Sequence, residues 1–294
     1  MCMKNCEKQV KDALRSITQQ DFPHDLMEVI LVDDGSEDST LSIVNNWKTN
    51  SDLKIKIFSY GWRGIGKCRN TIFENAEGEF ILWVDSDEIL SKSYVRNQVD
   101  FMKKDPKLGI AVGTPGLLNT WSLALTLEIL VDKVNCKIAQ KPRNFFWKSR
   151  KLPGTGGAIY RKEALEQVNG FDERLSSAGE DVDVARRIEN IGWQISINSH
   201  LFYETHGGFS TIYQLLKRYF YRGYGNRIAY VKNKKAFSLI RISPIGSIVA
   251  SILYSIEAYK LTSLKKSFLI TVHFSLKMIA WFFGFIKSQI TEKS

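Results

Sequence analysis

The chain has 294 residues, of which 44% are apolar and 24% charged, an ordinary globular composition that excludes a disordered or fibrous protein. Its four cysteines lack metal-site spacing, so we expect free thiols, and its first residues contain no apolar segment typical of a signal peptide. The net charge is +10, and residues 213–294 carry 14 Lys and Arg against two acids. This basic, apolar part favours an anionic membrane surface; nucleic acid is the competing interpretation, but we recognise no nucleic-acid module.

Strand and helix patterns alternate over the first part of the chain. The predicted elements are a helix over Lys4–Gln19, a strand over Glu28–Val32, a helix from Leu41 to Trp47, a strand over Lys54–Ser59, a glycine-rich turn at Gly61–Gly66 and a helix over Lys67–Asn75. This alternation predicts βαβ units and an α/β fold with a mostly parallel sheet flanked by helices.

The next apolar run, Phe80–Val84, ends in two carboxylates on alternate positions, Asp85 and Asp87. The run suits a buried strand of a parallel sheet, and ligands bind at the carboxyl ends of such strands. Two hard oxygen donors suit Mg²⁺ or Mn²⁺ together with a diphosphate. The alternative is an acidic turn in which Asp87 caps the following helix.

The second part of the chain continues the alternation. The predicted elements are a helix from Tyr94 to Met102, a strand over Ile110–Val112, a helix over Ser122–Val134, a basic aromatic loop at Gln140–Leu152, a helix over Asp181–Ile191, and strands over Trp193–Asn198 and Phe202–His206. Before a further apolar strand, Gly156 and Gly157 allow a ligand to approach the backbone closely.

Three features have both a functional and a plain structural interpretation. The turn before Arg69 would cradle phosphate through its N–H groups, or it is a simple turn. Glu180 and Asp181 begin a helix, where a carboxylate acts as a base or only caps the helix. His206 ends a strand and is a metal ligand only if it lies beside Asp87.

The C-terminal part begins with a basic, aromatic helix over Gln214–Tyr230, with a predicted break at Gly223–Gly225. It would clasp an acceptor phosphate or lie on a membrane. Two apolar segments follow, Ile242–Ala258 and Phe268–Ile286, and the second is long enough to span a bilayer. A central lysine, Lys277, costs about 2.5–3.5 kcal/mol on insertion scales. We therefore expect a hairpin anchored in or lying on the membrane; helices packed on the catalytic domain or in a homodimer are the alternative.

Five motifs together resemble the inverting, GT-A-fold glycosyltransferases of family 2. They are Val32–Ser36, the turn ending at Arg69 and Asn70, Asp85–Asp87, Asn169–Glu173 and Gly179–Asp181. The resemblance covers about Lys4 to Gly225 and implies a GT-A domain over residues 1–212, followed by a membrane-associated region over 213–294. The family begins with an apolar strand, and we expect that strand to be missing here.

The resemblance implies a nucleotide-diphosphate sugar donor and a role for each matching residue. Asp34, with Asp33 beside it, matches the acid that contacts the nucleotide base. Arg69 and Asn70 match residues near the donor, and Asp85 matches a residue that holds the diphosphate. Asp85 and Asp87 match the metal-binding D-x-D, which His206 joins in some members. Asp181 matches the usual base, and Glu180 is a neighbour that would exchange roles with it.

We therefore expect an inverting glycosyltransferase that uses Mg²⁺ or Mn²⁺ and a lipid-linked or cell-surface glycan acceptor. It would be membrane-associated, with its catalytic domain on the cytoplasmic face. Two other interpretations stay open. A truncated, non-catalytic relative would act as a membrane scaffold or binding subunit, and a nucleotidyltransferase would share the strand-end carboxylates and the metal.

Overall fold

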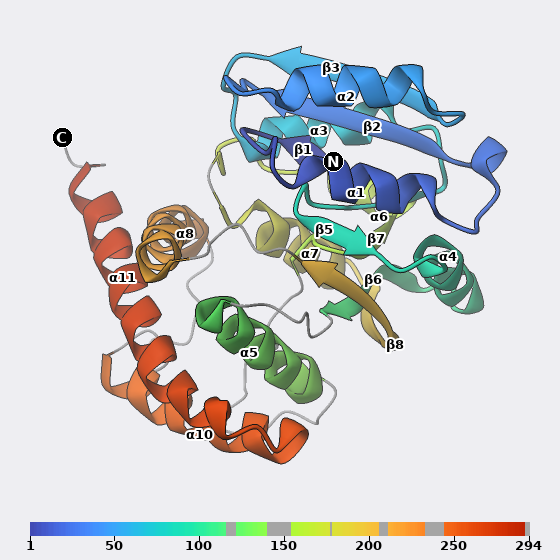
Figure 1. Ribbon diagram of the computed structural model, residues 1–294. Helices are drawn as coiled ribbons and strands as arrows, with labels where there is room; N and C mark the ends of the chain where they lie inside the picture. The colour runs from blue at the N-terminus through green and yellow to red at the C-terminus, as the bar shows by residue number, and fades with distance from the viewer. Residues whose placement is uncertain (116–121, 140–153, 177, 206–210, 233–243, 292–294) are drawn as a thin grey trace. The chain divides into compact units, whose positions relative to one another are not determined.

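The computed structural model describes residues 1–115, 122–139, 154–176, 178–205, 211–232 and 244–291 (Figure 1). The chain divides into two compact units. The first is formed from 1–116, 152–176 and 180–206, and the second from 117–151, 177–179 and 207–294. Each unit is described separately below.

The first unit begins with a three-stranded parallel sheet in the order β1-β2-β3. Its elements are β1 (Cys2–Met3), α1 (Val10–Thr18), a 3₁₀ turn at His24–Leu26, β2 (Glu28–Asp34), α2 (Thr40–Thr49), β3 (Lys54–Tyr60) and α3 (Ile65–Asn75). The apolar residues of β2 are buried, and the strand continues through both aspartates at its end. The predicted elements are therefore present here, although α1 begins later than the predicted helix.

We expected the family's first strand to be missing, and the structure has a two-residue strand, β1, at the start of the chain. Cys2 pairs with Val32 and Met3 with Asp33 in parallel register. The Met1 amino group donates a hydrogen bond of 2.8 Å to the Ile30 carbonyl, and the Val32 N–H donates one of 3.0 Å to the Met1 carbonyl. The first residues thus supply partners for backbone groups in the C-terminal half of β2.

The second sheet is five-stranded and mixed, in the order β4-β7-β6-β8-β5. Its strands are β4 (Phe80–Leu82), β5 (Glu88–Leu90), β6 (Leu108–Pro115), β7 (Ala158–Arg161) and β8 (Gln194–Thr205), accompanied by α4 (Tyr94–Lys104), α6 (Lys162–Gln167) and α7 (Glu180–Asn190). Only β6 and β8 pair in parallel, so the expected mostly parallel arrangement is wrong for this sheet. A buried apolar run has the same sequence pattern in either direction, which explains the error.

The core of the first unit surrounds Trp83, the residue after β4. Its ring meets Tyr160 and Phe171 edge-on, with centroids 6.2 and 5.3 Å apart. The same apolar cluster includes Val32 of β2 and Val184 of α7, so it joins both sheets to this helix. The packing fixes the chain directly before Asp85.

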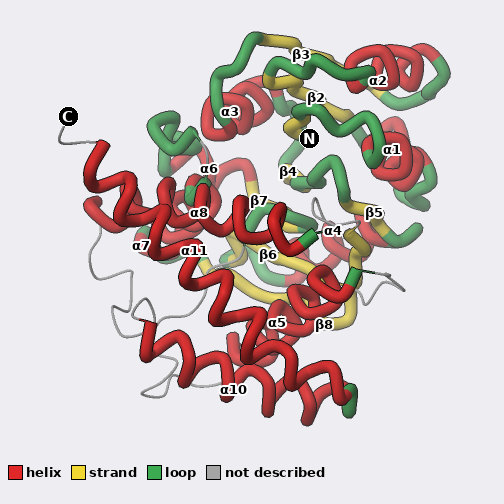
Figure 2. Tube along the Cα trace, turned by 60° about the vertical axis from the view of Figure 1, so that its left-hand side comes forward, coloured by secondary structure: helices red, strands yellow, loops and turns green. Residues whose placement is uncertain are grey.

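The second unit is helical over its described residues (Figure 2). It contains α5 (Leu123–Ala139), α8 (Ile212–Lys232), α10 (Pro244–Thr262), a 3₁₀ turn at Lys265–Leu269 and α11 (Ile270–Thr291). The predicted break in α8 is wrong, because that helix continues through Gly223. A Cβ at Gly223 would lie 1.9 Å from the Trp281 carbonyl oxygen, and one at Gly284 would lie 1.9 Å from the Phe220 oxygen. These two glycines therefore let the backbones of α8 and α11 meet.

Two polar residues near the middle of α11 point into this helical unit. Lys277 and His273 are buried, and both contact the Glu128 carboxylate on α5, His273 through a hydrogen bond of 2.6 Å. The Tyr219 hydroxyl on α8 donates to the second oxygen of Glu128 at 2.6 Å. Lys277 is therefore paired inside the protein, so the expected cost of an isolated central lysine does not arise.

We predict that Gly223→Ala destabilises the helical unit by about 1–3 kcal/mol, because the new methyl group meets the Trp281 backbone, which cannot rotate away. Alanine normally improves a helix, so a loss of stability would report this contact. Thermal and denaturant unfolding measure the effect. Gly61→Ala is the control, since its Cβ has nothing within 4 Å. Unchanged or higher stability of Gly223→Ala would contradict the close crossing.

Candidate functional site

Asp85, the first of the two carboxylates after β4, lies beside the turn of residues 154–157, which precedes β7. The Asp85 side chain is 45% exposed, and Asp87 is half-buried. A Cβ at Gly156 would lie 3.6 Å from the Asp85 Oδ2 atom, so the turn borders this carboxylate. The structure thus brings together the strand-end acids and the glycine turn, two features that are far apart in the sequence.

Asp181 borders the other end of the same turn. It is the second residue of α7, and its Oδ1 atom accepts a hydrogen bond of 2.7 Å from the Val182 N–H. A Cβ at Gly154 would lie 3.1 Å from the Asp181 Oδ2 atom. Residues 154–157 therefore connect the neighbourhoods of Asp85 and Asp181, and both carboxylates remain partly exposed.

A buried ion pair lies among these groups. The Arg69 Nε atom donates to the Glu180 Oε1 atom at 3.0 Å, and both side chains are buried. The Arg69 Nη2 atom is 4.0 Å from the Asp85 Oδ1 atom. The guanidinium also lies over the Trp83 ring, 5.1 Å from its centroid. Arg69 thus links α3 to the start of α7 and to the end of β4.

The charge state of Glu180 is set mainly by burial. Desolvation raises the pKa of Glu180 to about 7, and the negative charge of Asp181 adds to the increase, whereas Arg69 opposes it. Of the two acids that begin α7, the side chain that stays accessible is therefore Asp181.

Asp34 and Asp33 are also buried and have partners within the protein. The Asp34 carboxylate accepts hydrogen bonds from the N–H groups of Arg63, at 2.6 Å, and Gly64, at 3.2 Å. Asp33 accepts hydrogen bonds from the N–H and hydroxyl of Ser36. The N–H groups of Arg63 and Gly64, in the turn at Gly61–Gly66, are therefore already used. This favours the simple-turn interpretation of that turn over a phosphate cradle. Contact of either aspartate with a donor base stays a prediction.

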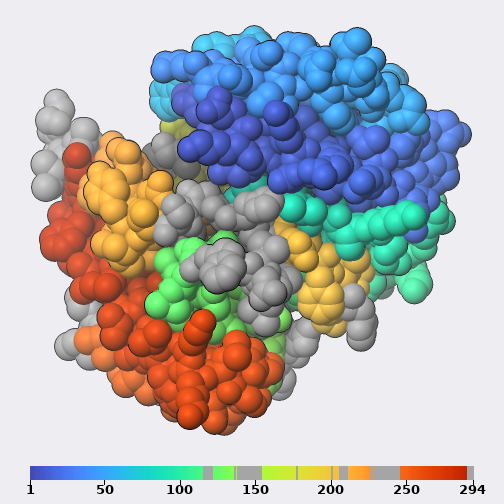
Figure 3. All heavy atoms as spheres, viewed as in Figure 1, coloured from blue at the N-terminus to red at the C-terminus, as the bar shows by residue number. Residues whose placement is uncertain are grey.

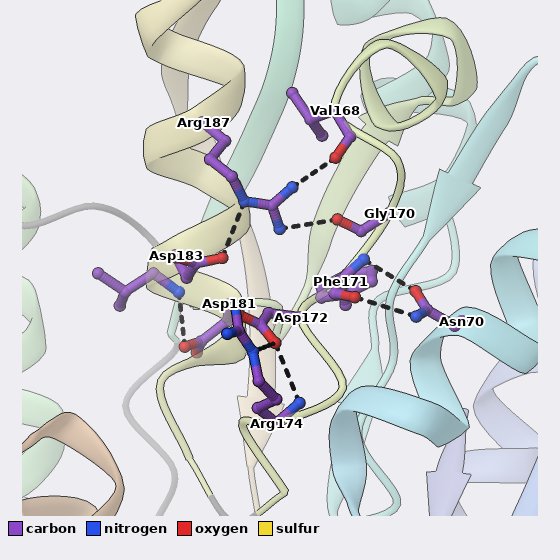
Figure 4. A network of polar contacts seen from close by, with 10 residues as sticks. Asn70, Val168, Gly170, Phe171, Asp172, Arg174, Asp181, Asp183 and Arg187 are labelled. Carbon is purple, nitrogen blue, oxygen red and sulfur yellow. Dashed lines mark hydrogen bonds and ion pairs between the residues drawn. The ribbon is translucent and has the colours of Figure 1, made fainter. Parts of the chain in front are cut away.

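Asn70 holds the turn that precedes α7 (Figure 4). Its side chain accepts a hydrogen bond of 2.8 Å from the Phe171 N–H and donates one of 3.0 Å to the Phe171 carbonyl. On the other side, Arg187 donates to the carbonyl oxygens of Val168 and Gly170, at 2.6 and 2.7 Å (Figure 4). The structure gives Asn70 a supporting contact, and its predicted contact with the donor stays a prediction.

Glu88 is a buried acid that the sequence analysis missed. Its Oε2 atom accepts hydrogen bonds from the Asp85 N–H at 2.9 Å and the Gly157 N–H at 3.1 Å. Burial raises the pKa of Glu88 well above its usual value, and the charge of Asp85 adds to this. The available signal was the third acid in the Asp85-Ser86-Asp87-Glu88 run, but an acid in such a run is normally solvated.

Asp85 and Asp87 fit a metal that keeps much of its coordination shell for phosphate and water. Mg²⁺ is usually held by one or two carboxylates together with substrate phosphates, and an accessible D-x-D pair supplies this donor chemistry. Within the described ranges, no group of three or more His, Cys, Asp and Glu side chains is arranged to hold a metal ion. His206, the third predicted ligand, lies outside the described residues.

The mixed sheet with its accessible strand-end carboxylates has the architecture of a GT-A glycosyltransferase. The family model of glycosyl transferase family 2 matches residues 1–168, more than half of the chain. The chain therefore belongs to glycosyl transferase family 2, and the family and GT-A fold predicted from the five motifs are confirmed.

Several proteins are similar to the chain. Poly(ribitol-phosphate) beta-N-acetylglucosaminyltransferase TarS from Staphylococcus aureus is 40% identical over 98 residues, which are 33% of this chain and 17% of TarS. Probable glycosyltransferase YdaM from Bacillus subtilis is 30% identical over 195 residues, 65% of this chain and 46% of YdaM. The chain thus matches less than half the length of these curated relatives.

Solved structures share the fold over nearly the whole chain. The mannosyltransferase PcManGT from Pyrobaculum calidifontis, in complex with GDP-Man and Mn²⁺, has a TM-score of 0.68 at 18% identity and covers 99% of this chain and 86% of its own. TarS 1–349 in complex with UDP-GlcNAc has a TM-score of 0.56 at 20% identity and covers 99% and 90%. At this identity, the likeness shows the fold alone.

We predict that Glu180 makes the stability of the first unit depend on pH. Because its pKa rises from 4.5 to about 7 on folding, its contribution is complete below about pH 4.5 and is lost as the pH rises to about 7. The shift corresponds to roughly 3 kcal/mol. Denaturant unfolding of the wild type and Glu180→Gln at several pH values measures this slope, which the variant should lack. Glu163→Gln, at an exposed position of α6, is the control, and equal slopes in wild type and Glu180→Gln would contradict the prediction.

Proposed function

We propose that the chain is an inverting glycosyltransferase that moves a sugar from a nucleotide-diphosphate donor to an acceptor hydroxyl. The observation that carries the proposal is the convergence of Asp85 and Asp181 on one glycine turn. In an inverting displacement, the acceptor hydroxyl attacks the sugar from the side opposite the departing diphosphate. The hydroxyl and the diphosphate therefore need separate polar groups, and this arrangement supplies two accessible carboxylates. The membership in family 2 supports the same reaction class.

In this proposal, Asp181 is the general base. The acceptor oxygen forms a bond to the anomeric carbon while the bond from that carbon to the diphosphate breaks, and the Asp181 carboxylate takes the hydroxyl proton. A positioned base of this kind contributes about 10²–10⁴-fold to the rate. Glu180 is less suited, because it is buried and paired with Arg69. One displacement inverts the configuration at the anomeric carbon.

Asp85 and Asp87 would hold Mg²⁺ or Mn²⁺, with His206 as a further ligand. When bound, the metal neutralises charge on the leaving diphosphate. The Arg69 guanidinium adds a positive charge, with its Nη2 atom 4.0 Å from the Asp85 Oδ1 atom. Gly156 and Gly157 would present their backbone to the donor, since Glu88, Tyr94 and Tyr203 fill the space that side chains would take there. Asp33, Asp34 and Asn70 support the loops nearby.

The named relatives narrow the choice of substrates to test. PcManGT was solved with GDP-Man and TarS with UDP-GlcNAc, so guanosine and uridine diphosphate sugars are the first donors to test. TarS is named for a poly(ribitol-phosphate) acceptor, and another relative from Staphylococcus epidermidis is a poly-beta-1,6-N-acetyl-D-glucosamine synthase. We propose a cell-surface or lipid-linked glycan as the acceptor of this chain.

We further propose that residues 213–294 associate with a membrane, with the catalytic domain of residues 1–212 on its cytoplasmic face. Among the described helices, the segment Lys265–Gln289 is long and apolar enough to cross a bilayer. Large apolar side chains are exposed along one stripe of α10, in the 3₁₀ turn that follows and along one stripe of α11. They are Ile248, Val249, Ile252, Ile256 and Tyr259 of α10, Phe268 and Leu269 of the turn, and Val272, Leu276, Ile279 and Phe283 of α11. In Figure 3 the orange and red atoms of these helices form a continuous part of the visible surface.

The charge near these stripes supports an anionic lipid surface. Lys260, Lys265 and Lys266 are exposed where α10 passes into α11. An apolar face bordered by lysines is the arrangement that binds the boundary of acidic bilayers. Helix α5 belongs to the same compact unit and supplies Glu128, which keeps the polar residues of α11 inside.

We predict Mn²⁺-dependent transfer or hydrolysis of one donor from a panel of UDP-, GDP- and dTDP-sugars. Asp87→Ala and Asp181→Asn should each lower turnover at least 100-fold, because one loses a metal ligand and the other the base. Product analysis by mass spectrometry measures the loss of turnover, and unfolding of each variant shows whether the fold remains stable. Glu79→Ala, at the far end of β4 from Asp85, is the control.

Each contrary outcome points to a different function. Full activity in either variant would contradict the assignment of that residue. A product that contains nucleotide would indicate a nucleotidyltransferase. Absence of binding to every donor would favour a non-catalytic scaffold.

We also predict that the protein floats with vesicles containing anionic lipid and that replacing Lys260, Lys265 and Lys266 by Gln weakens this binding. Each lysine near an acidic surface contributes about 1 kcal/mol, so the triple variant should bind about 100-fold more weakly. Flotation at several salt concentrations measures the loss. Gln at Lys103, Lys104 and Lys107, which are exposed in the first unit, is the matched control. Equal binding of both triple variants would contradict an electrostatic role of the hairpin.

A further inference from the structure

Glu88 is a buried carboxylate to which the proposed reaction assigns no role. It is 4% exposed and begins β5, directly after the two acids of the D-x-D pair. One oxygen, Oε2, accepts both the Asp85 N–H, at 2.9 Å, and the Gly157 N–H, at 3.1 Å. A single side-chain atom therefore joins the strand end that carries the carboxylates to the glycine turn beside it.

The glycine turn is held from its other side as well. The Gly157 carbonyl accepts a hydrogen bond of 2.6 Å from the Tyr94 hydroxyl and one of 3.1 Å from the Gln98 side-chain amide. Because Glu88 accepts the Gly157 N–H, both backbone polar groups of Gly157 have buried partners. The Gly157 carbonyl fixes the turn to Tyr94 and Gln98 of α4. Of these three side chains, Glu88 is the one that also contacts the D-x-D segment.

The other oxygen of Glu88 explains why the turn needs a small residue. A Cβ at Gly156 would lie 2.2 Å from the Glu88 Oε1 atom, which is too close for any side chain without movement of the glutamate. Gly157 has a φ of +61°, in the left-handed region that favours glycine. Glu88 and the two glycines therefore form one packed arrangement, in which the length of the glutamate side chain matters.

We propose that Glu88 is a positioning residue that sets the D-x-D carboxylates relative to the glycine turn for a metal-bound diphosphate. The inference rests on the proposed function, because it assigns the donor phosphates and their cation to this place. The partners of metal-binding groups typically change metal affinity by 10–100-fold when they are removed. A displacement of about 1 Å in a reacting group also costs on the order of 100-fold in rate.

Three substitutions separate the reach of the side chain from its carboxyl group. Glu88→Gln keeps an oxygen acceptor at the same distance from the backbone and cannot ionise. Glu88→Asp keeps a carboxyl group but shortens the side chain by one methylene, so it cannot meet both N–H groups in their present positions. Glu88→Ala removes the acceptor and leaves both N–H groups without this partner. Glu79→Ala, an exposed acid beside β4, is the matched control.

The experiment measures Mn²⁺-dependent binding of the nucleoside diphosphate from the active donor, steady-state kinetics, and hydrogen exchange at the Asp85 and Gly157 amides. We expect Glu88→Asp and Glu88→Ala to weaken Mn²⁺-dependent binding 10–100-fold, raise KM for the donor and speed exchange at both amides. Glu88→Gln should stay within about threefold of the wild type.

The outcomes distinguish this inference from the proposed function. If the wild type turns over a donor but Glu88→Asp binds Mn²⁺ and nucleotide as the wild type does, the positioning role is wrong and the glycosyltransferase proposal stands. If Glu88→Asp only unfolds more easily while its folded fraction binds normally, Glu88 is merely structural. If the wild type itself binds and turns over no donor, both proposals fail.

Discussion

The buried contact between Arg69 and Glu180 links three parts of the first unit. It joins α3 to the first residue of α7, and the guanidinium lies against Trp83 at the end of β4. Removing one partner of such a pair costs about 3–5 kcal/mol, because the remaining charge is left without compensation. The pair therefore fixes Asp181, the neighbour of Glu180, and Asp85, which faces Arg69, in the same small region. Stability and the geometry of the site thus share one interaction.

In the helical unit, buried contacts of one carboxylate, Glu128, likewise link several helices. Glu128 holds His273 and Lys277 inside, and one stripe of apolar side chains on α11, which includes Val272 and Phe283, is exposed. A helix in a water-soluble protein normally turns its apolar stripe inward. The buried pair thus orients α11 with its apolar stripe outward, which is the orientation a lipid surface would stabilise.

The sequence was informative where chemistry and pattern coincide. Asp85 and Asp87 stand out because they follow an apolar strand, and Asp181 because it lies at the start of a helix. The strand β2 was predicted from its run of apolar residues, which are buried in the structure. Strand direction was not predictable, because an apolar run such as β4 is compatible with either. Gly223 looked like a helix break, yet it serves a close helix crossing that depends on a partner 58 positions later in the chain, Trp281.

The contacts of Glu88 could not be predicted from the sequence, because its partner Gly157 is 69 positions away along the chain. The charges around Glu88 also bear on the metal. The negative charges of Asp85, Asp87 and Asp181 add to burial in raising the pKa of Glu88 and Glu180, and Arg69 is the cation that the described contacts place within 4.0 Å of Asp85. A donor diphosphate brings further negative charge to this place. Like charges repel one another more strongly near a partly buried site than in bulk water. A divalent cation bound by the exposed carboxylates would reverse the balance, so the same acidity that repels a free diphosphate would favour a metal-bound one.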